Sequence, residues 1–264
     1  MSAAASCERI ERYEARYVED YAYESWLVAG RRQATLESLR GSGARTVVEV
    51  GCGSDPLVLE AIGCMPHLER WVIVEPSALF LEIAARIADV VPEARVVRGF
   101  FESSKGDVIA ALGQDHADAI VIDGLLHELD DPDGLVRAAR SLLAPRGLLH
   151  ASVPNAFSMH RRLGRAMGLI DDVHRLSARN RHFEQRRVFD LEAFVALFAR
   201  CGFAIEKTGG HTMMPFASAQ MSAIEAQLGD EVFQGLTRLG EELPELAAEI
   251  YVDARRTTEG SIAP

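Results

Sequence analysis

The sequence has little of what membrane, secreted and nucleic-acid-binding proteins need. No apolar run approaches the ~20 residues that cross a bilayer. The first residues, MSAAASCERIERYE, have no basic leader before an apolar core, so we expect neither a secretory signal nor a membrane partner. A net charge of -11 disfavours a general nucleic-acid binder, because phosphate binding requires a basic surface.

Cysteine and lysine are also scarce. The four cysteines are scattered and form no C-x-x-C pair, so the sequence indicates neither a metal site nor a disulfide framework. A reduced, cytoplasmic setting fits this cysteine usage best. Lys105 and Lys207 are the only lysines, so arginine carries almost all of the basic charge.

The remaining composition is that of a globular protein, with 48% hydrophobic and 25% charged residues. Short β-branched runs alternate with helical segments from residue 45 to residue 153. This rhythm is typical of a doubly wound α/β fold, in which helices cover both faces of a parallel sheet. With no internal repeat and no linker, we expect one domain spanning residues 1–264.

Four segments are distinguished within this domain by pattern. We expect an N-terminal helical cap over residues 8–40, a ligand-binding core over 45–155, an arginine-rich lid over 156–189, and the rest of the sheet with its helices over 190–256. The lid is assigned because the chain there is long and irregular and breaks the strand–helix rhythm.

The stretch VVEVGCGSDP, residues 47–56, ends an apolar strand in a glycine-rich turn. Glycine allows the backbone to turn sharply and to approach a ligand closely. The dinucleotide fingerprint G-x-G-x-x-G is incomplete, because Pro56 stands at the third glycine position. Asp55 is a candidate N-cap for a helix that begins at Pro56. A purely structural turn remains the alternative.

Acidic side chains close three of the predicted strands. Glu49 lies in the first strand, Glu75 ends the second and Asp123 ends the fourth. The carboxyl ends of parallel strands form the ligand crevice of such a sheet, and an acid at the position of Glu75 can accept both hydroxyls of a ribose. Solvated strand ends are often acidic, but three together beside a G-x-G turn favour a ligand site.

These blocks together resemble the class I S-adenosylmethionine (SAM)-dependent methyltransferases, in particular bacterial enzymes that act on small molecules. The resemblance covers about 110 residues, and its matching blocks are VVEVGCGSD (47–55), VIVEPS (72–77), VRGFFE (97–102), ADAIVIDGLLHELDDP (117–132) and LLAPRGLLHASVPN (142–155). It implies a Rossmann-like sheet of seven mostly parallel strands with an antiparallel last strand, and SAM as the cofactor.

The resemblance also implies roles for individual residues. Gly51 and Gly53 would face the methionine part of SAM, with Glu49 organising the loop. Glu75 would hold the ribose hydroxyls. The remaining cofactor-binding positions lie beside these or near the adenine and the sulfonium: Cys52 and Pro76 in the same two loops, Phe101 and Glu102 by the adenine, and Asp123 and Gly124 beneath the sulfonium.

The charge of the predicted site distinguishes SAM from its main rival, an NAD-type cofactor. SAM carries a positive sulfonium, which an acidic pocket suits. Asp55 would repel a pyrophosphate at the helix start, so SAM is favoured over a dehydrogenase cofactor. A non-catalytic SAM-binding or regulatory protein is the rival of another class.

Two histidines are candidates for the catalytic base that an amine or hydroxyl acceptor would need. His127 directly follows the fourth strand and His160 follows the fifth. HELDD begins like the zinc motif H-E-x-x-H, but Asp131 replaces the second histidine, so we expect no metal. Each histidine could instead be a packing residue.

The lid holds an unusual concentration of positive charge. Residues 160–187 contain eight arginines against three acids in a chain that is acidic overall. Guanidinium groups pair with carboxylate or phosphate, so one interpretation is a site for an anionic small-molecule acceptor, by O- or N-methylation. The other is a solvated lid with internal salt bridges. The sequence does not indicate an oligomeric state.

Overall fold

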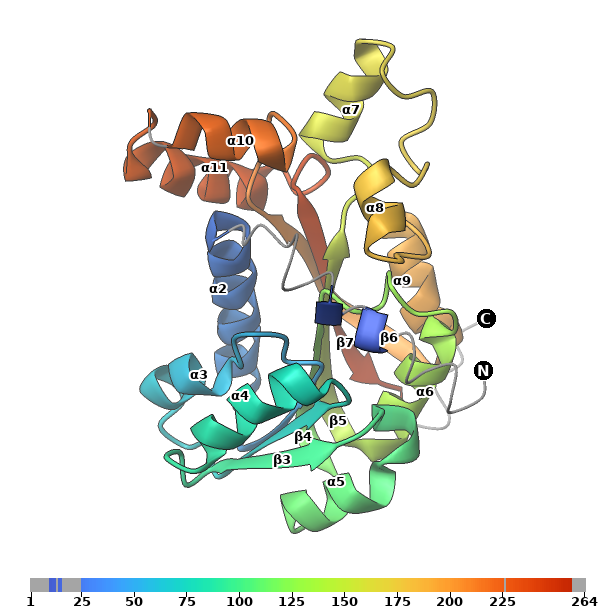
Figure 1. Cartoon of the computed structure of the whole chain (residues 1–264). Coiled ribbons are helices and arrows are strands. Elements are labelled where there is room, and N and C mark those ends of the chain that lie inside the picture. Colours follow the sequence, from blue (N-terminus) through green and yellow to red (C-terminus); the bar gives the residue numbers. More distant parts are fainter. Residues whose placement is uncertain (1–9, 13, 16–24, 226, 258–264) are drawn as a thin grey trace.

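The computed structural model describes residues 10–12, 14–15, 25–225 and 227–257. In this part of the chain one sheet has the strand order β3-β2-β1-β4-β5-β7-β6 (Figure 1). Neighbours among the first five strands are parallel, whereas β7 is antiparallel to both β5 and β6. The predicted doubly wound, Rossmann-like sheet with its antiparallel last strand is thereby confirmed. The strands are β1 (Thr46–Val50), β2 (Arg70–Glu75), β3 (Ala94–Arg98), β4 (Ala117–Asp123), β5 (Leu143–Pro154), β6 (Phe203–His211) and β7 (Glu249–Arg256).

Helices alternate with the strands, as the sequence pattern predicted. Four of the described helices begin with a side-chain cap, for example α4, where Ser77 Oγ accepts a hydrogen bond from the backbone N–H of Phe80. The helices are α2 (Ser25–Ser42), α3 (Val58–Cys64), α4 (Ala78–Ala88), α5 (Lys105–Leu112), α6 (Pro132–Leu142), α7 (Met159–Ala166), α8 (Ala178–His182), α9 (Leu191–Arg200), α10 (Ser218–Glu225) and α11 (Asp230–Glu242), with a short 3₁₀ helix at Phe101–Ser103.

The central strands are buried on both faces. Successive side chains of a strand point to opposite faces, so Val47 and Ile73 join one apolar cluster and Val48 and Val74 join another. The first cluster includes side chains of α2, α3 and α4, and the second includes side chains of α5, α6 and α9. Burial on both sides explains why these strands are continuous apolar runs rather than alternating ones.

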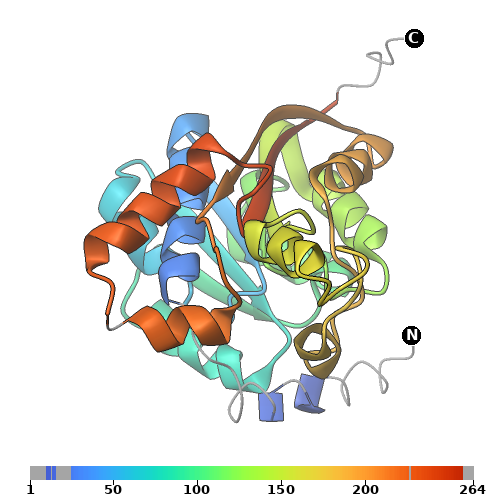
Figure 2. The same ribbon diagram turned by 90° about the horizontal axis from the view of Figure 1, so that it is seen from above.

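The predicted lid lies beyond one end of the sheet, whereas helix α2 of the predicted cap packs along the sheet beside its central strands (Figure 1). Helix α2 forms the described part of the cap together with residues 10–12 and 14–15, whereas residues 8–9, 13 and 16–24 lie outside the described ranges. The lid contains α7 and α8, which stand with α10 beyond the end at which β5 finishes (Figures 1 and 2). None of the helices in the described ranges combines the length and apolar character needed to cross a membrane.

One predicted helix start is wrong. The helix after the glycine-rich turn begins at Val58, and Asp55 does not cap it. The backbone N–H of Leu57 instead donates to Oε1 of Glu49 at 3.1 Å, while the Asp55 carboxylate lies 3.2 Å from the Arg32 guanidinium. A buried acid from the preceding strand thus serves the helix start, which local sequence rules do not anticipate.

Candidate functional site

The turn after β1 is held by the carboxylate of Glu49. Its Oε2 accepts from the indole N–H of Trp71 at 2.8 Å, and its Oε1 accepts from Leu57. Burial raises the pKa of Glu49 to about 7, although these two hydrogen bonds oppose the shift. Gly51 adopts φ +76°, which glycine reaches without strain, and its N–H pairs with the carbonyl of Val74. These hydrogen bonds fix the Glu49 side chain beside the turn, and its role at the cofactor stays a prediction.

Glu75 joins this loop to the start of α4. Its Oε2 accepts from the backbone N–H of Cys52 at 3.0 Å, and its Oε1 accepts from that of Ser77 at 2.8 Å. The side chain is only 4% exposed, and burial raises the pKa of the carboxyl. The Cys52 thiol also donates to Oε2, at 3.7 Å, and because each carboxylate oxygen can accept about two hydrogen bonds, Oε1 keeps acceptor capacity for a ligand. Burial also raises the pKa of the adjacent Cys52 thiol, which disfavours a reactive thiolate.

Asp123 is fixed at the end of β4 by two hydroxyl groups. Ser152 Oγ donates to its Oδ1 and Thr35 Oγ1 donates to its Oδ2, both at 2.7 Å. The next residue, Gly124, has φ +62°, and a Cβ placed there would lie 3.3 Å from Nη1 of Arg31. This close approach brings the cation of α2 to the strand end.

A cavity of about 1130 Å³ lies beyond these strand ends. Its walls include both candidate histidines and every predicted cofactor-binding residue: Glu49, Gly51, Cys52, Gly53, Glu75, Pro76, Phe101, Glu102, Asp123, Gly124, His127 and His160. Phe101 is buried and Glu102 is exposed, both in the 3₁₀ helix after β3. The fold thus brings together positions that lie up to 111 residues apart in the sequence. Their individual roles stay predictions.

The two candidate bases are neutral histidines in the cavity wall. Burial lowers the pKa of His127 to about 4, against the opposing effect of the Glu249 carboxylate, and burial with the Arg161 cation lowers that of His160 to about 4. The Nδ1 atom of each ring is buried and finds no hydrogen-bond partner within the described part of the chain. A buried polar atom at a cavity wall needs a partner, which a bound ligand could supply.

The lid is tied to the rest of the site through its backbone. The N–H groups of Arg186 and Arg187 donate to the carbonyl of His127 at 3.0 and 3.3 Å. Nη2 of Arg187 also donates to the carbonyls of Leu129 and Asp130. Movement of this part of the lid would therefore move the loop that carries His127.

Most lid arginines have structural partners. Arg161 braces the lid through the carbonyls of Val173 and Arg175, at 2.7 and 2.5 Å. Arg175 and Arg186 form ion pairs with acids that are largely exposed, which contribute little to stability. Those arginines that line the cavity are Arg161, Arg179 and Arg187. Both earlier interpretations of the segment thus have support, because internal pairing and cavity-facing cations coexist.

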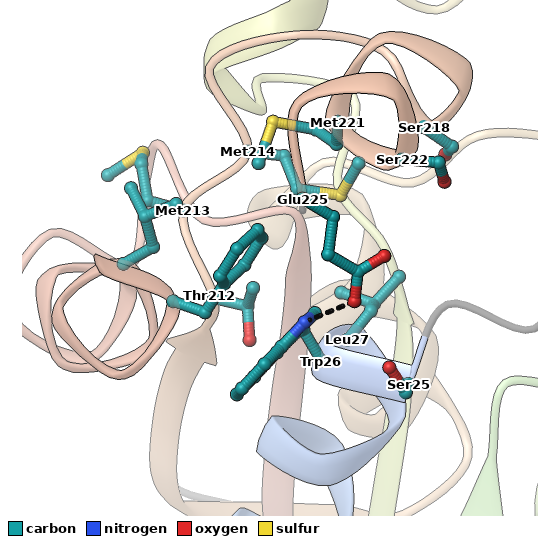
Figure 3. A pocket seen from close by; sticks show the side chains of 12 residues that line it. Ser25, Trp26, Leu27, Thr212, Met213, Met214, Ser218, Met221, Ser222 and Glu225 are labelled. Carbon is teal, nitrogen blue, oxygen red and sulfur yellow. Dashed lines mark hydrogen bonds between the residues drawn. The ribbon is translucent and has the colours of Figure 1, made fainter. Parts of the chain in front are cut away.

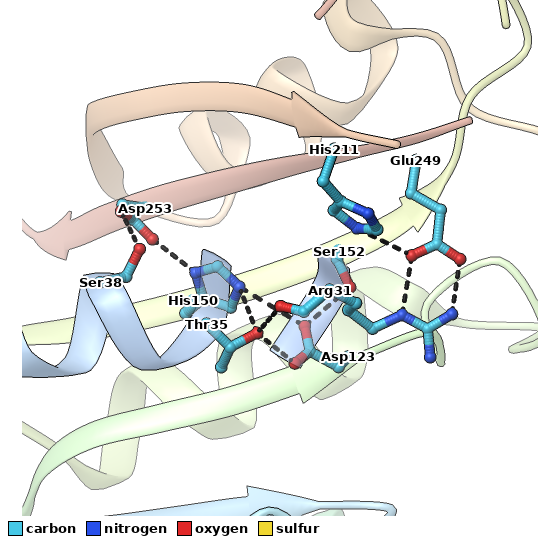
Figure 4. A network of polar contacts seen from close by, with 9 residues as sticks. All are labelled: Arg31, Thr35, Ser38, Asp123, His150, Ser152, His211, Glu249 and Asp253. Carbon is cyan, nitrogen blue, oxygen red and sulfur yellow. Dashed lines mark hydrogen bonds and ion pairs between the residues drawn. The ribbon is translucent and has the colours of Figure 1, made fainter. Parts of the chain in front are cut away.

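The sequence did not indicate an ion pair that lines the same cavity. Arg31 of α2 donates to Glu249 of β7 through Nε at 2.7 Å and Nη2 at 2.5 Å, and Nε2 of His211 lies 3.1 Å from the same carboxylate (Figure 4). Burial alone would raise the pKa of Glu249, but the two basic neighbours hold it well below its usual range. Because 218 positions separate Arg31 from Glu249, no local motif could have revealed the pair.

A smaller pocket of about 50 Å³ adjoins the cavity and shares Leu27, Met214 and Ser218 with it (Figure 3). Trp26 stacks on Phe233 there with ring centroids 4.7 Å apart, and its indole N–H donates to Glu225 at 2.7 Å. This side pocket has methionine and aromatic walls, which suit an apolar group. No cluster of three or more metal-ligating side chains occurs among the described residues.

Comparison with known proteins identifies relatives of this architecture. A family model described as "Methyltransferase domain" matches residues 23–208. Among curated proteins, none matches this sequence. Many solved structures share the fold.

A Burkholderia thailandensis 1,6-didemethyltoxoflavin-N1-methyltransferase, with its acceptor and S-adenosylhomocysteine bound, is 15% identical with TM-score 0.61, covering 98% of this chain and 92% of that one. The N-methyltransferase NodS from Bradyrhizobium japonicum, in complex with S-adenosylhomocysteine, is 12% identical with TM-score 0.58, covering 95% and 99%. The [4+2]-cyclase SpnF is 16% identical with TM-score 0.52, covering 86% and 82%. At these identities the likeness concerns the fold alone.

Proposed function

The chain belongs to the methyltransferase domain family and has the fold of class I SAM-dependent methyltransferases, and from this we propose that it transfers a methyl group from SAM to a small-molecule acceptor. The observation that carries this proposal is the single cavity in which Glu49, Glu75 and Asp123 meet the glycine-rich turn. When bound, SAM supplies an electrophilic methyl group on a positively charged sulfur. An acidic wall suits that charge, whereas a pyrophosphate would be repelled.

The residues present fit the cofactor. Glu75 is held in place by two backbone N–H groups and retains acceptor capacity for the ribose hydroxyls. Gly51 and Gly53 both have positive φ and present bare backbone to the cavity, on the side assigned to the methionine part. Phe101 and Glu102 follow β3, where we place the adenine.

The acceptor side is assigned to His127 and His160. Acceptor nitrogen or oxygen atoms that carry a proton must lose it during methylation, and a neutral imidazole can take it. Burial keeps both rings neutral at pH 7, and the Nδ1 atom of each has acceptor or donor capacity that the described residues leave unused. Among the described residues no carboxylate lies within hydrogen-bond distance of either Nδ1, and Oε1 of Glu128 lies 3.9 Å from Nε2 of His127. We propose proton acceptance as the role of these rings.

We propose further that the acceptor carries an anionic group, bound by lid arginines. Arg161, Arg179 and Arg187 line the cavity, and bidentate guanidinium groups are well suited to carboxylate or phosphate. The two methyltransferases described above methylate nitrogen, and for this chain we propose O- or N-methylation.

The setting is proposed to be cytoplasmic small-molecule biosynthesis in a bacterium, by one domain that spans residues 1–264. The free thiols of Cys52, Cys64 and Cys201 support a reducing environment. The rival interpretation, a SAM-binding protein without methyl transfer, has one observation in its favour, because a [4+2]-cyclase shares the fold. Turnover therefore has to be measured as well as binding.

Methyl transfer is tested with methyl-labelled SAM and a panel of small amines and hydroxyl compounds, in pairs with and without a carboxylate or phosphate. We expect label in an anionic acceptor, with one S-adenosylhomocysteine formed per methyl transferred. A KM that rises with salt would support the arginine contacts, because screening weakens them. Cofactor binding with no label in any acceptor would favour the non-catalytic rival, and a neutral preferred acceptor whose KM ignores salt would refute the anionic site.

Alanine substitutions test whether a lid arginine that lines the cavity binds the acceptor. Arg187→Ala should raise the KM of the acceptor, whereas Arg165→Ala is the matched control, since Arg165 lies in the same lid and does not line the cavity. Affinity for S-adenosylhomocysteine should be unchanged in both variants.

A further inference from the structure

Helix α2 docks on the sheet through polar side chains as well as through apolar ones such as Leu39. Arg31, Thr35 and Ser38 are spaced by four and three residues, so they share one face of the helix. We call the network that they enter the polar seam (Figure 4), and its members are Arg31, Thr35, Ser38, Asp123, His150, Ser152, His211, Glu249 and Asp253. Such a seam costs desolvation, which its hydrogen bonds and ion pairs offset.

His150 lies at the centre of the polar seam and is fully buried. Its Nδ1 is 2.6 Å from Oδ1 of Asp253, and its Nε2 is 3.1 Å from Oγ1 of Thr35 and 3.5 Å from Oδ1 of Asp123. The imidazole thus lies between two carboxylates, one of which lines the cavity.

The charges around His150 favour its cationic form. Burial alone would lower its pKa, but Asp123 from β4 and Asp253 from β7 raise it, against a smaller opposing effect of Lys207 from β6. Tyr251 of β7 packs against the ring at 5.4 Å, and α2 contributes only neutral hydroxyl groups to its contacts.

The number of protons available to the Thr35 hydroxyl and its neighbours also favours the cationic form of His150. The Thr35 hydroxyl has one proton and three possible acceptors: Oδ2 of Asp123 at 2.7 Å, the Arg31 carbonyl at 2.9 Å and Nε2 of His150. If Nε2 carries a proton, it donates to Thr35, and the Thr35 proton remains for the charged carboxylate. A neutral ring with its proton on Nδ1 would instead compete with Asp123 for the same hydroxyl proton.

We propose that His150 is a positioning residue of the cofactor site, a buried imidazolium that acts through the Thr35 hydroxyl to fix the Asp123 carboxylate at the cavity wall. The proposal rests on the function proposed above, because Asp123 matters only if the cavity binds the cofactor. His150 does not itself line the cavity, so its effect on the ligand passes through Asp123, by way of the Thr35 hydroxyl and of the 3.5 Å contact between Nε2 and Oδ1 of Asp123.

Calorimetric titration with S-adenosylhomocysteine tests the proposal on four variants of the full chain. Thr35→Val and His150→Gln should each weaken binding roughly ten-fold, the effect of one hydrogen bond to a charged group. Because the two act in series, the double variant should also lose roughly ten-fold rather than a hundred-fold. Ser38→Ala is the matched control: Ser38 donates to the far carboxylate, Asp253, and does not line the cavity, so affinity should change less than about two-fold.

Nitrogen-15 NMR of histidine-labelled wild-type protein gives a second readout at pH 7.5. We expect both ring nitrogens of His150 to carry protons, with the assignment made by loss of the signal in His150→Gln. A ring with one bare nitrogen would overturn the proposal, as would additive losses in the double variant or wild-type affinity in Thr35→Val. Wild-type protein that binds no S-adenosylhomocysteine would refute the proposed function itself, whereas unchanged variants of a binding protein refute only the role of His150.

Discussion

Glu75→Gln is the sharpest perturbation of the cofactor site, because the carboxylate has two backbone partners and one predicted ligand contact. A glutamine has one oxygen in place of two, so its NH₂ group would face either the N–H of Cys52 or that of Ser77. A buried donor left without an acceptor costs about 1–3 kcal/mol. Since the neutral amide also removes the desolvation cost of the carboxylate, we expect the loss of unfolding free energy to fall near the lower end of that range.

Cofactor affinity should fall further than stability does. The ribose contact is a hydrogen bond to a charged group, and its loss costs about 1.5–3 kcal/mol, or roughly a 10- to 150-fold rise in the dissociation constant of S-adenosylhomocysteine. The neutral amide lowers the desolvation cost equally in the free protein and in the complex, so this effect does not offset the lost binding free energy. Calorimetry measures the dissociation constant, and urea unfolding measures the stability of the same preparation.

Glu69→Gln is the matched control for this prediction. Glu69 precedes β2, the strand that Glu75 ends, and forms an exposed ion pair with Arg45 far from the cavity lining. We expect wild-type affinity and a change in stability of less than ~1 kcal/mol. A folded Glu75→Gln variant that binds S-adenosylhomocysteine as tightly as the wild type would remove Glu75 from the ribose site.

Three further predictions concern Gly124 after β4, the buried ion pair of Arg31 with Glu249, and the two candidate histidines. Gly124→Ala should cost about 1–2 kcal/mol, because φ is +62° and the new Cβ would press on Arg31, and thermal unfolding would detect it. Glu249→Gln removes the negative charge that the Arg31 guanidinium and the His211 ring face in this buried cluster, and it should cost about 3–5 kcal/mol at pH 7. The pKa of Glu249 is lower in the folded than in the unfolded chain, so its contribution to the free energy of unfolding is present above the unfolded pKa of about 4.3 and is lost progressively as pH falls below it. Urea unfolding should therefore show a smaller difference in unfolding free energy between wild type and variant at pH 3 than at pH 7. A difference that does not change with pH would contradict this. Alanine at His127 or His160 should lower turnover by about 10²–10⁴-fold, while the affinity for S-adenosylhomocysteine stays unchanged. The wild-type rate should not vary between pH 6 and 8, because burial lowers the pKa of both rings to about 4. Full turnover in both variants would show that neither histidine is the base.

The sequence predicted the sheet and the position of the cavity because both follow local rules. Apolar runs that end in Glu75 or Asp123 identify strands and their carboxyl ends, and parallel connections bring those ends to one edge. The resemblance to the methyltransferases is confirmed by the family match over residues 23–208. The hydrogen bond that Glu49 accepts from Leu57 was not foreseen, and the role predicted for Glu49 at the cofactor stays a prediction.

Contacts between distant segments could not be predicted in the same way. The last strand returns between β5 and β6, and only this return brings Glu249 to Arg31 and Asp253 to His150. The polar contacts of helix α2 were not predicted either, because arginine, threonine and serine on the docking face interrupt the apolar stripe by which a buried face is recognised.

Titration calorimetry with S-adenosylhomocysteine and NADH, side by side on the wild-type protein, tests the central claim most directly. The strand-end acids and the glycine-rich turn form one wall that suits a cationic or neutral sulfur and repels a pyrophosphate. We predict saturable binding of S-adenosylhomocysteine at one site per chain and no measurable binding of NADH. Saturable NADH binding with none of S-adenosylhomocysteine would contradict the account.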